Sequence, residues 1–274
     1  MRHGTAACAA RPPGDLVSER GEGAIAARPR HRWRRTVVIA ALVSGLSIGG
    51  AVLGTVVLGR AGLPGRATAE GEVVVRVWRT MLALAGAITG IVVSFVLVAL
   101  VEGWRGRHGP DPEQDHGDVR LEIAYTAIPL LVVAGVFGLS LDASADLDTA
   151  VPEDAVRVEV TGFQWGWRFA YEGGPTVVGA SPDAPELVLP VDRVVAFDLE
   201  STDVVHSFFS PAFLTKLDAV PGRTNRMVVE PSTTGTFRGH CAEFCGLDHP
   251  RMGFSVRIVS EDEYAAWLDD GGRS

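Results

Sequence analysis

The sequence has a single lysine, Lys216, and only three cysteines among its 274 residues. Three thiols cannot build the framework of paired cysteines that holds small secreted domains together. Two of them, Cys241 and Cys245, lie four positions apart, whereas Cys8 lies in a polar leader. The sequence lacks a constellation typical of hydride or acyl transfer, and its apolar segments have too few histidines to bind haem. Chemistry is therefore expected at the cysteine pair.

Positive charge is scarce in the second half of the chain. Residues 1–141 hold 15 Arg and Lys against 11 Asp and Glu, which is +4, and residues 142–274 hold 10 against 22, which is −12, so the sum is the net charge of −8. Such an acidic surface disfavours nucleic acid and speeds encounters with basic proteins. An excess of acidic residues also serves to keep a protein soluble, so the charge alone does not identify a binding partner.

Long uncharged apolar segments occupy the first half, at residues 36–59, 80–101 and 123–141. A helix needs about 20 such residues to cross a bilayer. The mean hydropathy of +0.20 also fits a protein that lies partly in a membrane. The sequence therefore predicts two to three transmembrane helices, as an apolar helix over 36–59 and a helical hairpin over 75–141.

The first apolar segment has two interpretations. The basic leader 1–35, which its composition predicts to be disordered, the apolar run and the tripeptide Ala67-Thr68-Ala69 together resemble a signal peptide with its cleavage site. The run exceeds the roughly 7–15 residues of a signal core, which favours an uncleaved helix. Arginines in the leader and in the 102–120 loop place both inside the cell, so residues 142–274 lie outside under either interpretation.

After residue 142 the pattern changes to short β-branched or alternating runs separated by turn residues. This pattern predicts a β-sandwich or barrel. The sequence from Ser260 to Glu263 is a capping box and predicts a short helix that ends near Asp269. The expected strands cover residues 156–160, 167–171, 194–199, 226–229, 236–238 and 254–259.

The stretch 239–252, GHCAEFCGLDHPRM, offers two thiolates, imidazole, thioether and carboxylate groups, and His206 lies upstream near the end of an expected strand. Thiolate and thioether favour copper(I), and imidazole accepts both copper states. Two cysteines four apart can bridge two metal ions, each with one imidazole, with Met252 and a carbonyl as weak ligands. A Cys2His2 zinc site would use the same residues, although the isolated His206 fits its usual spacing poorly. A Cys241–Cys245 disulfide is the other alternative.

These residues resemble a known family. CAEFCGLDHPRM, DVVHSFFSPAF and KLDAVPGRTN are similar to the CuA domain of cytochrome c oxidase subunit II, and the resemblance covers about residues 75–270. It implies a membrane-anchored all-β protein, with two to three transmembrane helices before a cupredoxin-like Greek-key β-sandwich over 142–274. It also implies a dinuclear copper centre and a magnesium ion shared with subunit I through Glu243. The implied copper ligands are the side chains of His206, Cys241, Cys245, His249 and Met252 and the backbone carbonyl of Glu243.

Two further segments carry the resemblance. TGFQWGW, residues 161–167, implies that Trp165 is the entry point for electrons from cytochrome c, although a core aromatic strand would show the same pattern. LEIAYTAIP, residues 121–129, implies that Glu122 lies at the mouth of a proton-uptake path. Without the resemblance, Glu122 is an interfacial carboxylate favoured at a helix N-terminus.

The sequence identifies residues that dock a partner protein less specifically than it identifies the metal ligands. The family binds basic cytochrome c through acidic groups, and Asp203 and Asp218 lie in matching segments. Tyr125 and Phe209 stand where the family has tryptophan, and neither is an implied ligand.

The expected function is that of subunit II of cytochrome c oxidase, a proton-translocating enzyme complex. The chain accepts electrons from cytochrome c, soluble or tethered, and passes them to haem a of subunit I, where oxygen is reduced to water. Subunit I, other oxidase subunits and membrane lipid are the further expected partners, and nucleic acid is not one. The expected location is the plasma membrane, with the copper domain on the extracytoplasmic side. The alternatives are a CuA subunit of another respiratory reductase and a copper-binding carrier.

Overall fold

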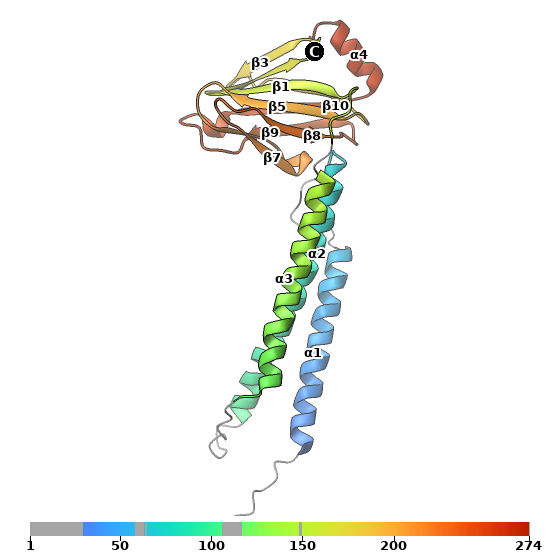
Figure 1. The fold of residues 1–274 in the computed structure, drawn as a ribbon, viewed down its shortest axis with the longest axis vertical. Coiled ribbons are helices and arrows are strands. Elements are labelled where there is room, and N and C mark those ends of the chain that lie inside the picture. The colour runs from blue at the N-terminus through green and yellow to red at the C-terminus, as the bar shows by residue number, and fades with distance from the viewer. Residues whose placement is uncertain (1–29, 58–62, 64, 106–116, 148–149, 274) are drawn as a thin grey trace, which may run out of the picture.

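The computed structural model describes residues 30–57, 63, 65–105, 117–147 and 150–273. Three long helices lie side by side, and a β domain sits at one end of them (Figure 1). These helices are α1 (Arg30–Val57), α2 (Glu70–Arg105) and α3 (Val119–Leu147). Residues 1–29 of the predicted leader lie outside the described residues, and α1 begins within the basic run that precedes the apolar segment.

Helices α2 and α3 are long and apolar enough to cross a membrane. Their large apolar side chains point outward, as Phe95 at 63% exposure and Leu131 at 70% illustrate. A helix that is apolar on its outer face is stable only where lipid or another protein covers it. The helical hairpin therefore has the character of a membrane anchor.

Helix α1 packs along α2 through small side chains. A Cβ added to Gly90 would lie 2.3 Å from the Cβ of Ser47, so the backbones approach as closely as glycine permits. Ser94, one turn further along α2, is 1% exposed. Small residues at helix crossings are typical of packing within membranes.

The β domain consists of two five-stranded sheets, and this confirms the prediction of apolar helices followed by a cupredoxin-like β-sandwich. One sheet has the order β3-β2-β1-β5-β8 and the other the order β4-β10-β9-β6-β7. The strands are β1 (Val156–Phe163), β2 (Gly166–Tyr171), β3 (Thr176–Ala180), β4 (Glu186–Pro190), β5 (Val195–Ser201), β6 (His206–Ser210), β7 (Thr215–Ala219), β8 (Asn225–Val229), β9 (Gly235–Cys241) and β10 (Gly253–Val259).

The sequence located six of these strands and the last helix. Helix α4 (Glu261–Asp269) follows Ser260, whose hydroxyl accepts a hydrogen bond from the Glu263 N–H at 3.3 Å. Strands β3, β4, β6 and β7 were not among the expected runs. His206 is consequently the first residue of a strand, β6, rather than a residue near the end of one.

Aromatic side chains fill the space between the two sheets. Phe208 on β6 stacks on Phe254 of β10 with ring centroids 4.6 Å apart, and Trp167 of β2 meets both rings edge-on. All three are at most 3% exposed. Aromatic pairs in such geometry stabilise a core beyond the burial of their area. Since Phe208 is two residues from His206, this core fixes the strand that carries His206.

The tripeptide that resembles a cleavage site is part of the β domain. The N–H of Ala67 donates to the carbonyl of Ala212 at 2.7 Å, and that of Ala69 donates to the carbonyl of Glu230 at 2.9 Å. Ala67 and Thr68 are 0% exposed. These residues directly precede α2, so they fasten the start of that helix to the domain.

Candidate metal centre

Two segments of one sheet build the candidate metal centre. Cys241 is the last residue of β9, and the loop that leads to β10 carries the other residues of the motif. The Cys241 N–H donates to the Met252 carbonyl at 2.9 Å and closes this loop at its base. The Ala242 N–H donates to the carbonyl of Ser207 at 3.0 Å, which joins the loop to β6. These bonds hold the loop against the strand that begins with His206.

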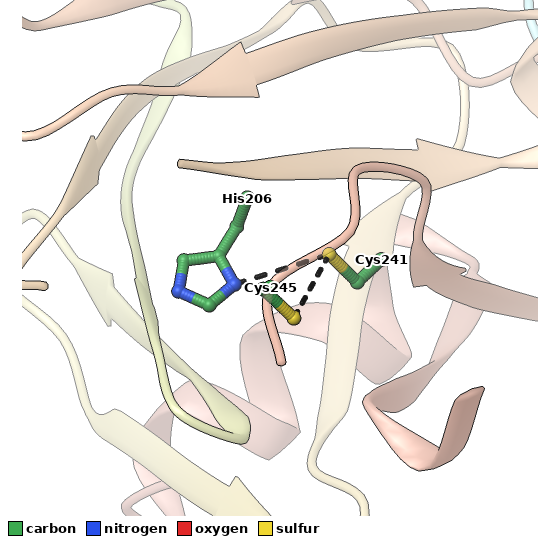
Figure 2. Close-up of side chains that lie close together, drawn as sticks. All are labelled: His206, Cys241 and Cys245. Atoms are coloured by element: carbon green, nitrogen blue, oxygen red, sulfur yellow. Dashed lines mark hydrogen bonds between the residues drawn. The ribbon is translucent and has the colours of Figure 1, made fainter. Parts of the chain in front are cut away.

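Two further atoms that could bind a metal ion, called donors here, lie beside the sulfur of Cys241. Figure 2 shows Nδ1 of His206 directed at this sulfur, and the two atoms are 3.9 Å apart. The carbonyl oxygen of Glu243 lies 3.2 Å from the same sulfur. The sulfur of Cys245 lies 3.9 Å from that of Cys241. The ligand atoms of His206, Cys241 and Cys245 all lie within 4.8 Å of one another, and all three residues are buried.

The sulfur of Cys245 has a donor pair of its own. Nδ1 of His249 and Sδ of Met252 each lie 3.6 Å from it. Met252 is 1% exposed, so its thioether is directed into the cluster rather than to solvent. Each sulfur thus has one imidazole nitrogen and one weaker donor, an arrangement that suits two metal ions sharing both sulfurs.

The chemistry of these donors fits copper. The sulfur–sulfur distance of 3.9 Å far exceeds the roughly 2.05 Å of a disulfide, and both cysteines are free thiols in this structure. Thiolate and thioether sulfur select soft copper(I), and imidazole suits both oxidation states. The structure thus brings together all six donors that the sequence singled out.

The two thiols have opposite pKa shifts. Burial, reinforced by the charge of Cys241, raises the pKa of Cys245 to about 12. Burial acts in the same direction on Cys241, but its hydrogen bond with His206 and further hydrogen bonds outweigh burial and lower that pKa to about 6. Burial likewise opposes the charged form of His206, yet hydrogen bonds with Cys241 and Asp203 raise its pKa overall. At neutral pH the metal-free centre therefore holds one thiolate and one thiol.

Copper binding should release protons in a pH-dependent number. Both sulfurs must be thiolates to bind metal, so Cys245 gives up its proton at any pH below about 12, and Cys241 adds a second one below about pH 6. Titration of the metal-free chain with copper in weak buffer should release one thiol proton at pH 8. At pH 5 it should release two, together with any proton from His206. Release of the same number of protons at pH 8 and pH 5 would contradict the opposite pKa shifts of Cys241 and Cys245.

The structure brings one of the two remaining predicted residues to the centre. Trp165 lies in the turn between β1 and β2, and its Nε1–H donates to the carbonyl of Cys245 at 3.2 Å. Its neighbour Gln164, which the sequence did not single out, donates to the same carbonyl at 2.8 Å. Glu122 instead lies in the first turn of α3, at the end of the bundle away from the β domain (Figure 1).

Comparison with known proteins places this architecture in a family. A family model described as cytochrome c oxidase subunit II, periplasmic domain, matches residues 181–259, which include the six donors. A protein of Streptomyces avermitilis described as probable cytochrome c oxidase subunit 2 is 34% identical over 284 residues, which cover 88% of each chain. The chain belongs to the cytochrome c oxidase subunit II family.

Other subunit II proteins are similar over parts of the chain. Cytochrome c oxidase subunit 2 of Alkalihalophilus pseudofirmus is 37% identical over 190 residues, and the match spans 67% of this chain but about half, 54%, of that relative. Among solved structures, the periplasmic domain of subunit II of cytochrome oxidase from Bradyrhizobium japonicum is 34% identical. That match has a TM-score of 0.40 and covers 44% of this chain and 96% of the other.

Proposed function

We propose that this chain is the electron-entry subunit of a cytochrome c oxidase. Its six donors hold a dinuclear copper centre that takes electrons from cytochrome c and delivers them to haem a of subunit I. Subunit I reduces oxygen to water, and the complex translocates protons. The division of the donors into two sets, one around each sulfur, is the observation that carries this proposal.

When bound, the copper pair supplies reversible storage of one electron. The protein holds the donors in place and keeps water out. His206, Cys241, Cys245 and Met252 are at most 3% exposed. Packed side chains in this setting change position little between oxidation states, since a close-packed interior resists rearrangement. Such rigidity favours electron transfer over bond-making chemistry.

Trp165 has the position of an electron-entry residue. Its half-buried indole reaches from the surface turn between β1 and β2 to the backbone of Cys245. The hydrogen bond from Nε1 connects the ring to the carbonyl of a residue whose own sulfur is a metal donor. An aromatic face at the surface is also a suitable contact for the edge of a haem.

The remaining assignments concern the complex. Residues 36–59 and the hairpin 75–141 form the anchor after the basic leader 1–35, and domain 142–274 lies outside the plasma membrane. The exposed side chain of Glu243, beside the centre, is available to a magnesium ion shared with subunit I. Glu122, at the far end of the bundle, is placed to collect protons at the inner surface. Cytochrome c and membrane lipid are the further partners.

Copper loading of the full chain tests the proposal. The detergent-purified protein should bind two coppers, and its electron paramagnetic resonance spectrum should show one unpaired electron shared equally by both nuclei. A chain that binds a single zinc or copper ion, or two coppers with a localised electron, would overturn the assignment.

A further inference from the structure

Asp203 carries a carboxylate that faces the metal centre rather than solvent alone. Its Oδ1 lies 2.8 Å from Nε2 of His206, on the side of the ring opposite the metal-facing Nδ1. Its Oδ2 accepts a hydrogen bond from the backbone N–H of Gln164 at 2.7 Å. One side chain therefore joins β6 to the turn between β1 and β2, across 39 positions of sequence.

Local hydrogen bonds hold this carboxylate in place. Oδ1 of Asp203 also accepts from the N–H of Val204 at 2.6 Å. The N–H of Asp203 donates to the hydroxyl of Ser201 at 3.2 Å. Both carboxylate oxygens are thus used within the domain, and the side chain is 30% exposed. These contacts leave Asp203 little freedom to turn toward a partner protein.

The contact with His206 determines which ring nitrogen can bind metal. A neutral imidazole carries one N–H, and a carboxylate at Nε2 keeps the proton there and leaves the lone pair of Nδ1 free. The ring is closely enclosed, because His206 is 0% exposed and the Gly162 backbone lies so near that an added Cβ would be 3.0 Å from the imidazole. The same imidazole edge is therefore always presented to the sulfurs.

The contact with Gln164 extends to the backbone of Cys245, the residue that carries the second sulfur. The side chain of Gln164 donates to the carbonyl of Cys245 at 2.8 Å, and the adjacent Trp165 donates to the same oxygen. From its backbone to its amide group, Gln164 thus spans the distance between Asp203 and the loop that carries Cys245. The carboxylate and the turn together connect a donor on β6 with the donor loop after β9.

We infer that Asp203 is a positioning residue, which fixes His206 as an Nδ1 ligand and holds the Trp165 turn against Cys245. This role rests on the proposed function, because it concerns the same centre. It differs from that of an acidic docking residue, which would act through its charge at the surface. Asp218 provides the comparison, since its side chain is 44% exposed and lies 3.9 Å from Lys216.

Copper binding by three variants of the full-length chain in detergent tests this inference. Asp203→Ala should weaken copper binding by about 10- to 100-fold, the usual loss when the partner of a ligating histidine is removed. Its copper hyperfine pattern should also change, because His206 is no longer held. Asp203→Asn keeps one acceptor oxygen and should give an intermediate loss with a normal melting temperature. Asp218→Asn removes the same charge from a side chain that faces Lys216 rather than the His206 ring, and it should retain the affinity and spectrum of the original chain.

Each outcome separates the inference from the proposed function. If the unmodified chain shows no shared electron over two coppers, the proposed function fails. If it does, and both Asp203 variants match it in affinity and hyperfine pattern, only the positioning role is overturned. Should Asp203→Ala fail to fold, the result for Asp203→Asn decides alone. A copper spectrum of Asp203→Asn identical to that of Asp218→Asn would then overturn the inference.

Discussion

Cys245→Ser is expected to abolish the two-copper signal of this protein. A serine hydroxyl stays protonated at neutral pH and is a poor ligand for soft copper(I), so the bridge between the two ions is lost. The imidazole of His249 and the thioether of Met252 both lie beside the sulfur of Cys245. Without that sulfur, neither group has the thiolate beside it that would complete a copper site. Copper affinity should fall by more than the roughly 10- to 100-fold that removal of an outer partner causes.

Copper analysis and electron paramagnetic resonance of the detergent-purified chain measure this effect. Cys8→Ser is the matched control, since it makes the same substitution outside the motif and should leave two coppers and the shared-electron spectrum. Two coppers with delocalised valence in Cys245→Ser would rule out a sulfur bridge between Cys241 and Cys245.

Trp165→Phe is expected to slow the entry of electrons from cytochrome c by about 10²-fold, a loss that misplacement of a reacting group can reach. Phenylalanine keeps an aromatic ring but lacks the Nε1–H that donates to the carbonyl of Cys245. The indole body that carries the contact from the surface turn to this carbonyl is also shortened. Because Trp165 is not a metal donor, copper content should remain at two per chain.

Stopped-flow reduction of the loaded chain by cytochrome c measures this rate. A small uncharged reductant that reaches copper without the turn should react at the same rate with both forms. Trp104→Phe makes the same exchange at an exposed position of α2 and should reduce normally. Reduction of Trp165→Phe by cytochrome c at the original rate would exclude Trp165 as the entry point.

The grouping of the potential metal ligands was predictable because most of them are close in the chain. Five of the six lie from Cys241 to Met252, so their short spacing keeps them close together in any fold. Their residue types restrict the kinds of metal ion that they can bind. The membrane helices were predictable for a similar reason, since length and apolarity decide whether a segment can span a bilayer. The division of the donors between the two sulfurs needed the structure.

Contacts across long stretches of sequence were not predictable. Gln164 meets Cys245 across 81 positions, and only the pairing of strands brings the two together. The sequence marked Asp203 as one acidic residue among many, because nothing in composition tells which way a carboxylate points. Strands β4 and β6 were missed since each is five residues long and buried throughout or nearly so, which gives no alternating pattern to recognise.

The buried segment from Ala67 to Ala69 gives the β domain a second attachment to the helical bundle, made by hydrogen bonds and burial, in addition to the covalent link of the chain that leaves α3. A domain attached through one linker swivels about it, whereas one attached at two separate points is restrained in tilt. Under the proposed function, contacts within this chain thus restrain the height and inclination of the copper centre relative to the helices. The proposed electron donor therefore meets a centre whose tilt is restrained rather than free.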